Sequence, residues 1–391
     1  MVLNIYFEYK KLNKPLNFCI IMFNGAVILI TGGTGSWGNE LTKQLLKNYI
    51  PKEIRIYSRG EHKQVQMKLK FPNEKRIKYF IGDVRDKNRL LIASKGVDYI
   101  FHLAALKHVP ICEENPWESV LTNIYGTRNV IESAIENNVK KVIDVSTDKA
   151  VDPFNMYGVC KSCGEKIMIS ANSETDKTSF VCIRAGNVIG TNGSVIPLFK
   201  NQISKNNEIT ITDERMSRYF FSLPQAINLI FKATIDSLGG EIFVMKMPSA
   251  RISDLAEVMI EELGNRDTKI KKIGIRPGEK LYEVLVSRYE IQSCVESGEY
   301  FVILPNKKNE KISEKYQLLK TPKVQEFNSE NTHIMSKDEI REILKKEGWL
   351  EHNGENPLDY YGSKLTEIEL KNVFVAEGWQ SNKITKLEKD D

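Results

Sequence analysis

An apolar strand that runs directly into a glycine-rich turn is the feature that most constrains the fold. The stretch VILIT at residues 27–31 is followed by GGTGSWG at 32–38, and a helical pattern continues from Gly38 to Asn48. Glycines 32, 35 and 38 allow a tight turn and a close approach of the backbone to a pyrophosphate at a helix N-terminus. We therefore interpret this segment as a dinucleotide-binding strand–turn–helix unit.

The same alternation of short apolar runs and amphipathic stretches continues through the first half of the chain. The expected strands are Val27–Thr31, Glu53–Tyr57, Ile77–Ile81, Tyr99–Ala104, Val142–Ser146 and Phe180–Arg184. The expected helices are Gly38–Asn48, Glu61–Lys70, Lys87–Lys95, Trp117–Asn137 and Met156–Ala171. Apolar strands that alternate with helices predict an α/β fold with a doubly wound parallel sheet, covered on both faces, of the Rossmann type.

The regular alternation of strands and helices ends after Arg184, and we divide the chain at this point. We expect a dinucleotide-binding domain over 22–185 and a smaller mixed α/β substrate domain over 186–300, with some segments that complete the first sheet. That second part has short strands at Ile209–Thr212, Glu241–Met245 and Lys271–Ile275, and helices at Leu223–Ser237 and Ser253–Leu263. Residues 1–21 are interpreted as a disordered extension.

Residues 301–391 are expected to form a polar tail with one or two helices. Ser336 and Glu339 make a capping box, and Gly348 suits a helix end. The tripeptide Glu-Gly-Trp at 347–349 recurs at 377–379, again after a helical pattern. A duplicated docking helix and two unrelated glycine-stopped helices both explain this repeat.

Composition excludes several function classes. No run of 18 apolar residues occurs, and the first residues lack a clear cleavage site, so we expect no membrane span, no signal peptide and a cytoplasmic location. The net charge of +5 is small for 391 residues and does not call for nucleic acid. Cys160 and Cys163 form a CxxC pair inside a helical pattern, which favours helix packing over a metal or redox site. No metal is expected.

Charged residues after the second strand indicate which dinucleotide is bound. Arg59 follows this strand and Lys63 lies one turn further on, where an acid would favour NAD and a basic residue accommodates the 2′-phosphate of NADP. We therefore expect NADP. After the third strand the Asp83 carboxylate is placed to reach the adenine, and Ala104 and Ala105 close the fourth strand with side chains small enough to let a cofactor lie close.

The fifth strand and the helix after it carry the candidate catalytic residues. Thr147, Asp148 and Lys149 end the strand, and Tyr157 and Lys161 follow at helical i,i+4 spacing, which places them on one face. The Lys161 ammonium is expected to lower the pKa of Tyr157 and to bind the nicotinamide ribose. Tyr157 then removes a hydroxyl proton while hydride leaves to the nicotinamide.

These motifs together resemble the extended short-chain dehydrogenase family, and more narrowly the UDP-N-acetylglucosamine 4,6-dehydratases of polysaccharide biosynthesis, especially the 5-inverting enzymes of pseudaminic acid synthesis. The stretches that carry the resemblance span Met22 to roughly Arg288. They are TGGTGSWG, YSRGEHKQ, GDVRD, HLAALKHVP, VSTDKAVDPFNMYGVCK, GNVIGTNGSVIP, TITDERMSRYF and IGIRPGEKLYEVL. The chain departs from the pattern at Ala185, where the family usually has Tyr, and its last hundred residues match loosely.

The resemblance assigns the remaining site residues. It implies a nucleotide-sugar site lined by Lys107, Asn187, Val195, Thr212, Arg218, Arg276 and Glu279. The complete expected cofactor site comprises Gly32, Thr34, Gly35, Ser36, Trp37, Gly38, Ser58, Arg59, Lys63, Asp83, Val84, Ala104, Ala105, Lys107, Tyr157, Lys161 and Val188. It also implies a homo-oligomer, either a dimer or a hexamer.

Asp148 and Lys149 distinguish a dehydratase from other enzymes of this fold. Oxidation at C4 of the sugar acidifies the C5 proton, which Lys149 could accept if its pKa were lowered by nearby Lys161 and the cofactor. Asp148, if protonated, could protonate the departing C6 hydroxyl. A UDP-sugar 4-epimerase has no use for this pair, and a non-enzymatic NADP-binding regulator would not need Tyr157 or Lys161. A retaining 4,6-dehydratase remains an alternative.

Overall fold

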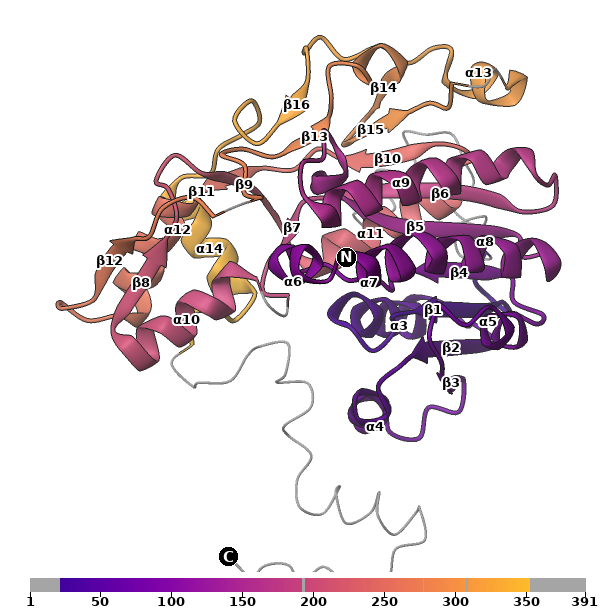
Figure 1. The fold of residues 1–391 in the computed structure, drawn as a ribbon, viewed down its shortest axis with the longest axis horizontal. Helices are drawn as coiled ribbons and strands as arrows, with labels where there is room; N and C mark the ends of the chain where they lie inside the picture. The colour runs from indigo at the N-terminus through magenta and orange to yellow at the C-terminus, as the bar shows by residue number, and fades with distance from the viewer. Residues whose placement is uncertain (1–21, 192–193, 277, 307–308, 352–391) are drawn as a thin grey trace, which may run out of the picture.

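A nine-stranded sheet organises the larger part of the molecule (Figure 1). The computed structural model describes residues 22–191, 194–276, 278–306 and 309–351. The extension expected at 1–21 and the second Glu-Gly-Trp segment at 377–379 lie outside these residues. The strand order is β14-β15-β10-β6-β5-β4-β1-β2-β3. The seven strands from β10 to β3 are parallel, and β15 and β14 add an antiparallel edge.

The expected Rossmann-type sheet is confirmed, and the strands that were predicted in it lie within two residues of their expected limits, whereas the edge strands β14 and β15 were not predicted. Its strands are β1 (Val27–Thr31), β2 (Glu53–Ser58), β3 (Ile77–Ile81), β4 (Tyr99–His102), β5 (Lys141–Thr147), β6 (Ser179–Ala185), β10 (Ile242–Met245), β14 (Cys294–Ser297) and β15 (Tyr300–Ile303). All five residues of β1 are buried, as expected for a central strand covered on both faces.

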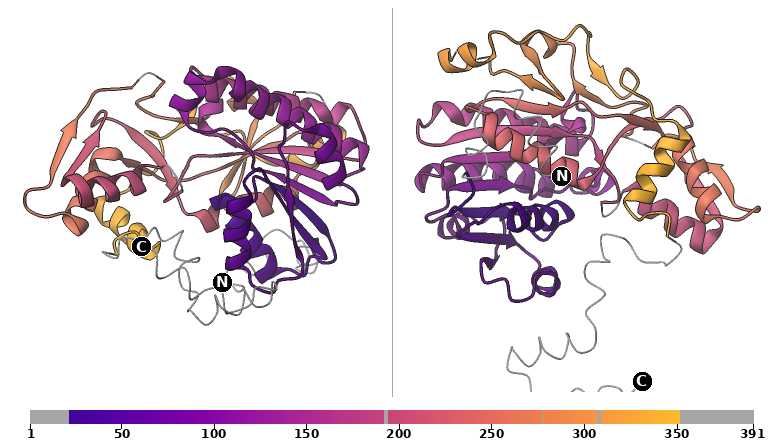
Figure 2. Two further views of the ribbon diagram at one scale, coloured as in Figure 1. Left: turned by 60° about the horizontal axis from the view of Figure 1, so that its bottom comes forward. Right: turned by 180° about the vertical axis from the view of Figure 1, so that it is seen from behind.

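Helices cover both faces of this sheet (Figure 2). One face carries α3 (Ser36–Asn48) and α11 (Leu223–Asp236), which pack against each other. The other carries α5 (Lys87–Ala93), α8 (Gly126–Glu136) and α9 (Met156–Ser170). The helix α4 (Glu61–Lys70) follows β2. Each face buries its own apolar cluster, so the first unit is a three-layer sandwich.

The helix expected over Trp117–Asn137 is interrupted. After the short helices α6 (Val109–Glu114) and α7 (Pro116–Val120), a π-helical turn at Leu121–Tyr125 precedes α8. Such turns inside helices often occur at functional sites. Here the turn carries Asn123, whose buried side chain bonds both the N–H and the carbonyl of Leu106 at 2.9 Å.

A smaller unit lies beside the carboxyl edge of the sheet (Figures 1 and 2). It contains the sheet β11-β9-β7 and the pair β12-β8, while β13 pairs with β16. The strands are β7 (Asn187–Val188), β8 (Glu208–Ile211), β9 (Ser217–Phe221), β11 (Ser249–Arg251), β12 (Lys269–Lys272), β13 (Val284–Val286) and β16 (Phe327–Asn328). The helices are α10 (Val195–Asn206), α12 (Ile252–Leu263) and α14 (Lys337–Lys346). The helix α13 (Glu310–Tyr316) packs instead against the core of the nine-stranded sheet.

The expected boundary at residue 300 is wrong, because it cuts between segments that fold together. β15 belongs to the main sheet, and α14 packs on α12 in the core of the smaller unit. The capping box of Ser336 and Glu339 at the start of α14 is confirmed. Trp349, just after this helix, is only 2% exposed and lies against Gly190. The part of the tail up to Leu350 therefore contributes to the core.

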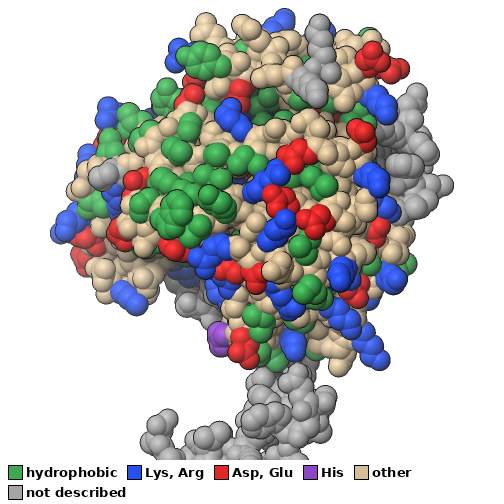
Figure 3. Space-filling view, turned by 45° about the vertical axis from the view of Figure 1, so that its right-hand side comes forward, with side chains coloured by type: hydrophobic (Ala, Val, Ile, Leu, Met, Phe, Trp, Pro, Cys, Tyr) green, Lys and Arg blue, Asp and Glu red, His purple; other side chains and the backbone are tan. Residues whose placement is uncertain are grey.

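Exposed hydrophobic side chains gather on one face of the molecule (Figure 3). Large hydrophobic residues of α6, α7, the π-helical turn and α9 are exposed, namely Ile111, Trp117, Tyr125 and Val159. The rings of Trp117 and Tyr125 stack edge-to-face with centroids 6.4 Å apart. Within the described residues, none of the helices has the length and apolar character needed to cross a membrane.

Candidate active site

The glycine turn is built for close backbone approach. Gly32 has φ of 66°, and a Cβ there would lie 2.8 Å from the backbone nitrogen of Ala104. A Cβ at Gly38 would lie 2.2 Å from the carbonyl oxygen of Gly33. Gly35 caps α3 in an extended conformation without a side-chain hydrogen bond. The first-turn N–H groups of α3, from Ser36 onward, therefore suit a phosphate, and these residues fit a dinucleotide.

Basic side chains stand at the edge of β2, where the sequence places the adenosine end of the cofactor. Arg59 and Lys63 are both exposed, and Arg59 Nη1 lies 4.0 Å from Asp83 Oδ2. Ser58 is buried, and its hydroxyl accepts a hydrogen bond from Gln64 at 3.0 Å. The arrangement leaves two cations beside the predicted ribose position, available to a 2′-phosphate.

Asp83 has a partner that sequence reasoning missed. Arg85 donates to its carboxylate from Nε at 2.9 Å and from Nη2 at 2.7 Å. Burial acts to raise the pKa of Asp83, but these bonds outweigh it and hold the pKa below its ordinary value. Tyr57 donates its hydroxyl proton to the Asp83 carbonyl at 2.7 Å, and the adjacent Val84 packs in the core. The Asp83 backbone is thus fixed at the sheet edge.

Tyr157 and Lys161 lie buried on α9, whose N-cap Asn155 accepts a hydrogen bond from the Gly158 N–H at 2.8 Å. The charge of Lys161 lowers the pKa of Tyr157 as expected, but burial is the larger effect, so the net pKa is raised. Lys161 Nζ lies 3.3 Å from both carboxylate oxygens of Asp144 on β5. Asp144, fully buried, was not predicted from the sequence.

Thr147, Asp148 and Lys149 form a connected group where β5 ends. The Thr147 hydroxyl donates to Asp148 Oδ1 at 2.8 Å, and Lys149 Nζ donates to the same oxygen at 3.0 Å. Asp148 is 1% exposed, and its Oδ2 accepts no hydrogen bond from any described residue. The structure brings this group together with Tyr157, since the charges of Lys149 and Asp148 both act on the tyrosine.

Glu283 completes the group and was missed by the sequence analysis. It precedes β13, is 3% exposed, and its Oε1 lies 3.4 Å from Lys149 Nζ and 3.6 Å from Arg218 Nε. The available signal was its place in the stretch GEKLYEVL, four residues after the predicted Glu279. An acidic side chain inside an otherwise apolar run is costly to bury without a partner.

The predicted lowering of the pKa of Lys149 is wrong for the protein without ligands. Burial does act to lower it, but the charges of Asp148 and Glu283 outweigh burial and the opposing charge of Arg218, so the pKa is raised. Lys161, which the prediction invoked, is not among the groups that act on Lys149. Lys149 is therefore a protonated partner of two carboxylates before substrate arrives.

Lys107 lies on the loop that Asn123 anchors. Desolvation by the surrounding protein, followed by repulsion from Lys149, lowers the pKa of Lys107, although part of its side chain reaches solvent. Ala104 and Ala105, before it on the same loop, are half-buried. Lys149 is thus close enough to Lys107 to lower its pKa.

The other predicted sugar-site residues are distributed over the smaller unit. Asn187 and Val188 form β7, Val195 begins α10, and the Thr212 hydroxyl contacts the Met216 sulfur at 3.0 Å. Arg218 is nearly buried, and its guanidinium donates to the carbonyls of Ser217, Lys280 and Leu281. Arg218 therefore anchors the 280–283 segment in this conformation.

Arg276 and Glu279 lie on the segment before it. Their side chains are 3.9 Å apart, and Arg276 is exposed. Asn155 donates to the Gly278 carbonyl at 3.1 Å, and Lys280 donates to the carbonyls of Val151 and Asp152. The segment is thus tied to the start of the helix that carries Tyr157.

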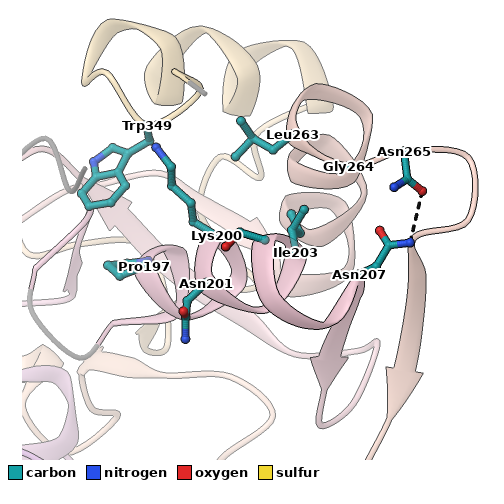
Figure 4. Close-up of a pocket in the computed structure, with 10 residues that line it drawn as sticks. Pro197, Lys200, Asn201, Ile203, Asn207, Leu263, Gly264, Asn265 and Trp349 are labelled. Carbon is teal, nitrogen blue, oxygen red and sulfur yellow. Dashed lines mark hydrogen bonds between the residues drawn. The ribbon is translucent and has the colours of Figure 1, made fainter. Parts of the chain in front are cut away.

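A cavity of about 300 Å³ in the smaller unit is not this site (Figure 4). It lies between α10, the end of α12 and Trp349, with Lys200 along one wall and a hydrogen bond between Asn207 and Asn265 at its end. None of the predicted catalytic or cofactor residues lines it. The chemistry-bearing side chains lie instead where β5 and α9 meet the 280–283 segment.

Comparison with known proteins places this geometry in context. Residues 28–305 match a family described as polysaccharide biosynthesis protein. The chain is 44% identical over 340 residues to a protein of Methanocaldococcus jannaschii named an uncharacterized membrane protein, covering 84% of this chain and 98% of that one. It is 47% identical over 288 residues to the UDP-N-acetylglucosamine 4,6-dehydratase (inverting) of Campylobacter jejuni, covering 73% and 84%.

Relatives that are named epimerases are nearly as similar to this chain as the dehydratase is. A protein of Rickettsia bellii named UDP-glucose 4-epimerase is 44% identical over 331 residues, covering 83% of this chain and 96% of that one. Among solved structures, Pen from Bacillus thuringiensis superposes with a TM-score of 0.77 at 41% identity, covering 83% of this chain and 100% of that one.

Proposed function

The chain belongs to the polysaccharide biosynthesis protein family, and from that premise we propose that it is a 4,6-dehydratase that acts on UDP-N-acetylglucosamine with inversion at C5. The observation that carries this proposal is the buried group of Asp148, Lys149 and Glu283 beside Tyr157. Relatives are named both dehydratase and epimerase, so the site has to discriminate between them.

An acid–base pair is what elimination requires and epimerisation does not. In a 4-epimerase, Tyr157 and Lys161 suffice to move the proton of the 4-hydroxyl while hydride leaves and returns. Loss of water also needs one group for the C5 proton and another for the departing C6 hydroxyl. Burying Asp148 and Glu283 with Lys149 and Arg218 costs desolvation free energy, and ionisable groups buried in this way cluster at functional sites.

Tyr157 and Lys161 would act first. When bound, a nicotinamide dinucleotide accepts hydride from C4 and returns it at C6. Tyr157 accepts the proton of the 4-hydroxyl, with the charge of Lys161 opposing the cost of burying a phenolate. The salt bridge to Asp144 holds Lys161 in place for this task.

Asp148 and Lys149 would then carry out the elimination. Transfer of a proton from Lys149 Nζ to Asp148 Oδ1, across 3.0 Å, converts the ion pair into a neutral amine and a carboxylic acid. The amine accepts the C5 proton, the C5–C6 double bond forms, and the C6 hydroxyl leaves as water with the proton from Asp148. The elimination leaves Lys149 as the ammonium and Asp148 as the carboxylate, and the Lys149 ammonium then gives a proton to C5 to complete the product.

NADP, the pathway and the oligomeric state are further parts of this proposal. Exposed Arg59 and Lys63 support NADP over NAD. The product would be a UDP-4-keto-6-deoxy-N-acetylhexosamine used for nonulosonic acids or other surface glycans, made in the cytoplasm. The exposed face with Trp117 and Tyr125 supports a homo-oligomer, because a contiguous apolar surface of this kind is costly to leave in water.

Proton NMR of the reaction with UDP-N-acetylglucosamine in heavy water tests the proposed function. We expect a new methyl signal from C6, deuterium at C5 and the inverted configuration there. A product that keeps its C6 hydroxymethyl group and differs only at C4 would identify an epimerase instead. A methyl product with unchanged C5 configuration would identify the retaining dehydratase.

A further inference from the structure

We propose that Glu283 is a positioning residue for the elimination step, which holds Lys149 Nζ between two buried carboxylates so that Lys149 and Asp148 keep one proton between them. The proposal rests on the proposed function for the step that Lys149 performs, and on the structure for the contact itself. Glu283 acts through Lys149 and is given no proton transfer of its own.

The geometry around Lys149 Nζ supports this role. Asp148 Oδ1 lies 3.0 Å from the nitrogen, and Glu283 Oε1 lies 3.4 Å from the same nitrogen. Glu283 is 3% exposed, so its charge is poorly screened by water. Lys149 itself keeps 24% of its side chain exposed, as a group that must reach a substrate requires.

The backbone around Glu283 is fixed by contacts that leave its carboxylate pointed at Lys149. Its N–H donates to the Ser329 hydroxyl at 3.0 Å, and its carbonyl accepts from the Ser329 N–H at 2.9 Å. The Arg218 guanidinium donates hydrogen bonds to the carbonyls of the preceding residues Lys280 and Leu281. The carboxylate is therefore held by a rigid frame.

The charges that face Lys149 explain what Glu283 contributes. Asp148 lies on the same helical turn as Lys149. The other groups come from four further parts of the structure, namely Glu283 before β13, Arg218 on β9, Tyr157 on α9 and Lys107 on the loop after β4. Arg218 disfavours the ammonium, whereas Asp148 and Glu283 favour it. Without Glu283, Asp148 alone would favour the Lys149 ammonium against the charge of Arg218, so the proton that Lys149 shares with Asp148 would be lost at lower pH.

The ionisation of Lys149 can be measured without substrate or cofactor. Competitive acetylation of the folded protein across a range of pH, read out by mass spectrometry of the peptide that contains Lys149, gives its titration curve. We expect Glu283→Gln to lower the pKa of Lys149 by about 1–3 units, the effect of removing an opposite charge at this distance. Glu283→Ala removes the same charge and should give the same direction if Gln destabilises the fold.

Two controls separate charge from packing. Glu283→Asp keeps the charge and should leave the pKa of Lys149 closer to wild type than Gln does. Glu296→Gln removes a carboxylate from the edge strand β14, where it pairs with Lys246, and should leave Lys149 unchanged. An unchanged pKa of Lys149 in folded Glu283→Gln, or an equal fall in the Asp and Gln variants, would overturn the proposal.

The rate of product formation then distinguishes this inference from the proposed function. In Glu283→Gln the alkaline limb of the pH–rate profile should move to lower pH by the same amount as the pKa of Lys149. A shifted pKa in a chain whose wild type forms no 6-deoxy product would refute the proposed function and leave the contact standing. A 6-deoxy product with an unmoved alkaline limb would refute the positioning role alone.

Discussion

Tyr157 is buried at the start of α9, and its environment opposes ionisation more strongly than sequence spacing alone indicates. Burial raises its pKa, and the ammonium groups of Lys161 and Lys149 act in the opposite direction. Tyr157 can act as a base only when cofactor and substrate complete the site, because a phenolate shielded from water needs nearby cations to stabilise its charge.

Removing the hydroxyl group of Tyr157 tests its role as the proton acceptor. Tyr157→Phe should lower turnover by about 10²–10⁴-fold, the usual contribution of a positioned proton-transfer group. Binding of the UDP-sugar, measured by titration calorimetry, should be retained. Tyr289→Phe is the matched control, since Tyr289 is 77% exposed. Retention of more than about a tenth of the turnover rate in Tyr157→Phe would contradict the assignment.

The site residues that could be predicted from the sequence form patterns within short segments of the chain, whereas the residues that were missed form no such local pattern. The glycine turn, Thr147 to Lys149, and the Tyr157–Lys161 pair are local patterns, which spacing reveals directly. Glu283 reaches Lys149 through long-range packing of β13 against the helical turn Asp148–Ala150 that follows β5, and Asp144 is a strand residue with no turn beside it. The raised pKa of Lys149 depends on both carboxylates around it, so it could not be predicted from one segment.

At the scale of elements, the β2–α4 connection decides which dinucleotide is preferred. Arg59→Ala should weaken NADP binding tenfold or more, because a charge-assisted bond contributes about 1.5–3 kcal/mol, and should change NAD binding little. Titration of both cofactors into the cofactor-free protein measures this. Lys68→Ala, on the helix α4 that follows this connection, is the control. Equal affinities of the unaltered chain for NAD and NADP would contradict the prediction.

The central strand β4 carries a pH-sensitive group. His102 is 1% exposed and bonds the hydroxyls of Thr31 and Thr127 at 2.7 and 3.3 Å. Burial lowers the pKa of His102 to about 4, from 6.5 in the unfolded chain. The folded state therefore disfavours protonation, so the stability linked to neutral His102 is complete above pH 6.5 and is lost as the pH falls toward 4.

This linkage predicts a measurable slope. The free energy of unfolding should fall by up to about 3 kcal/mol between pH 6.5 and 4, at about 1.4 kcal/mol per pKa unit. Urea unfolding of His102→Gln should show a shallower dependence over this range, and the exposed His62→Gln should keep the full slope. The same slope in all three proteins would show that other groups cause it.

Elements were predictable where local pattern and burial agree. β1, β3 and α4 begin and end where expected, and the capping box of α14 is present. The smaller unit was predicted less well, since α10 and the paired strands β13 and β16 lack a period that distinguishes them from loops. The strand expected at Lys271–Ile275 lies at Lys269–Lys272, because pairing with β8 sets its register.

For the whole molecule, the exposed face of α7 and the π-helical turn predicts self-association. We expect sedimentation velocity at micromolar concentration to show a dimer or larger species. Trp117→Lys should shift it toward the monomer, because a buried charge without a partner opposes association. Leu318→Lys replaces another exposed side chain and should have no such effect. A monomeric unaltered chain would contradict the expected homo-oligomer.

Lys149→Ala, assayed with UDP-N-acetylglucosamine in heavy water, tests whether Lys149 is the base of the elimination. Oxidation at C4 requires Tyr157 and Lys161 but not Lys149, so reduced nicotinamide absorbance should appear and persist. The variant should release no 6-deoxy product and should incorporate no deuterium at C5, because the amine that accepts the C5 proton is gone. Ready exchange at C5 in Lys149→Ala, or normal release of product, would show that Lys149 is not the base that accepts the C5 proton.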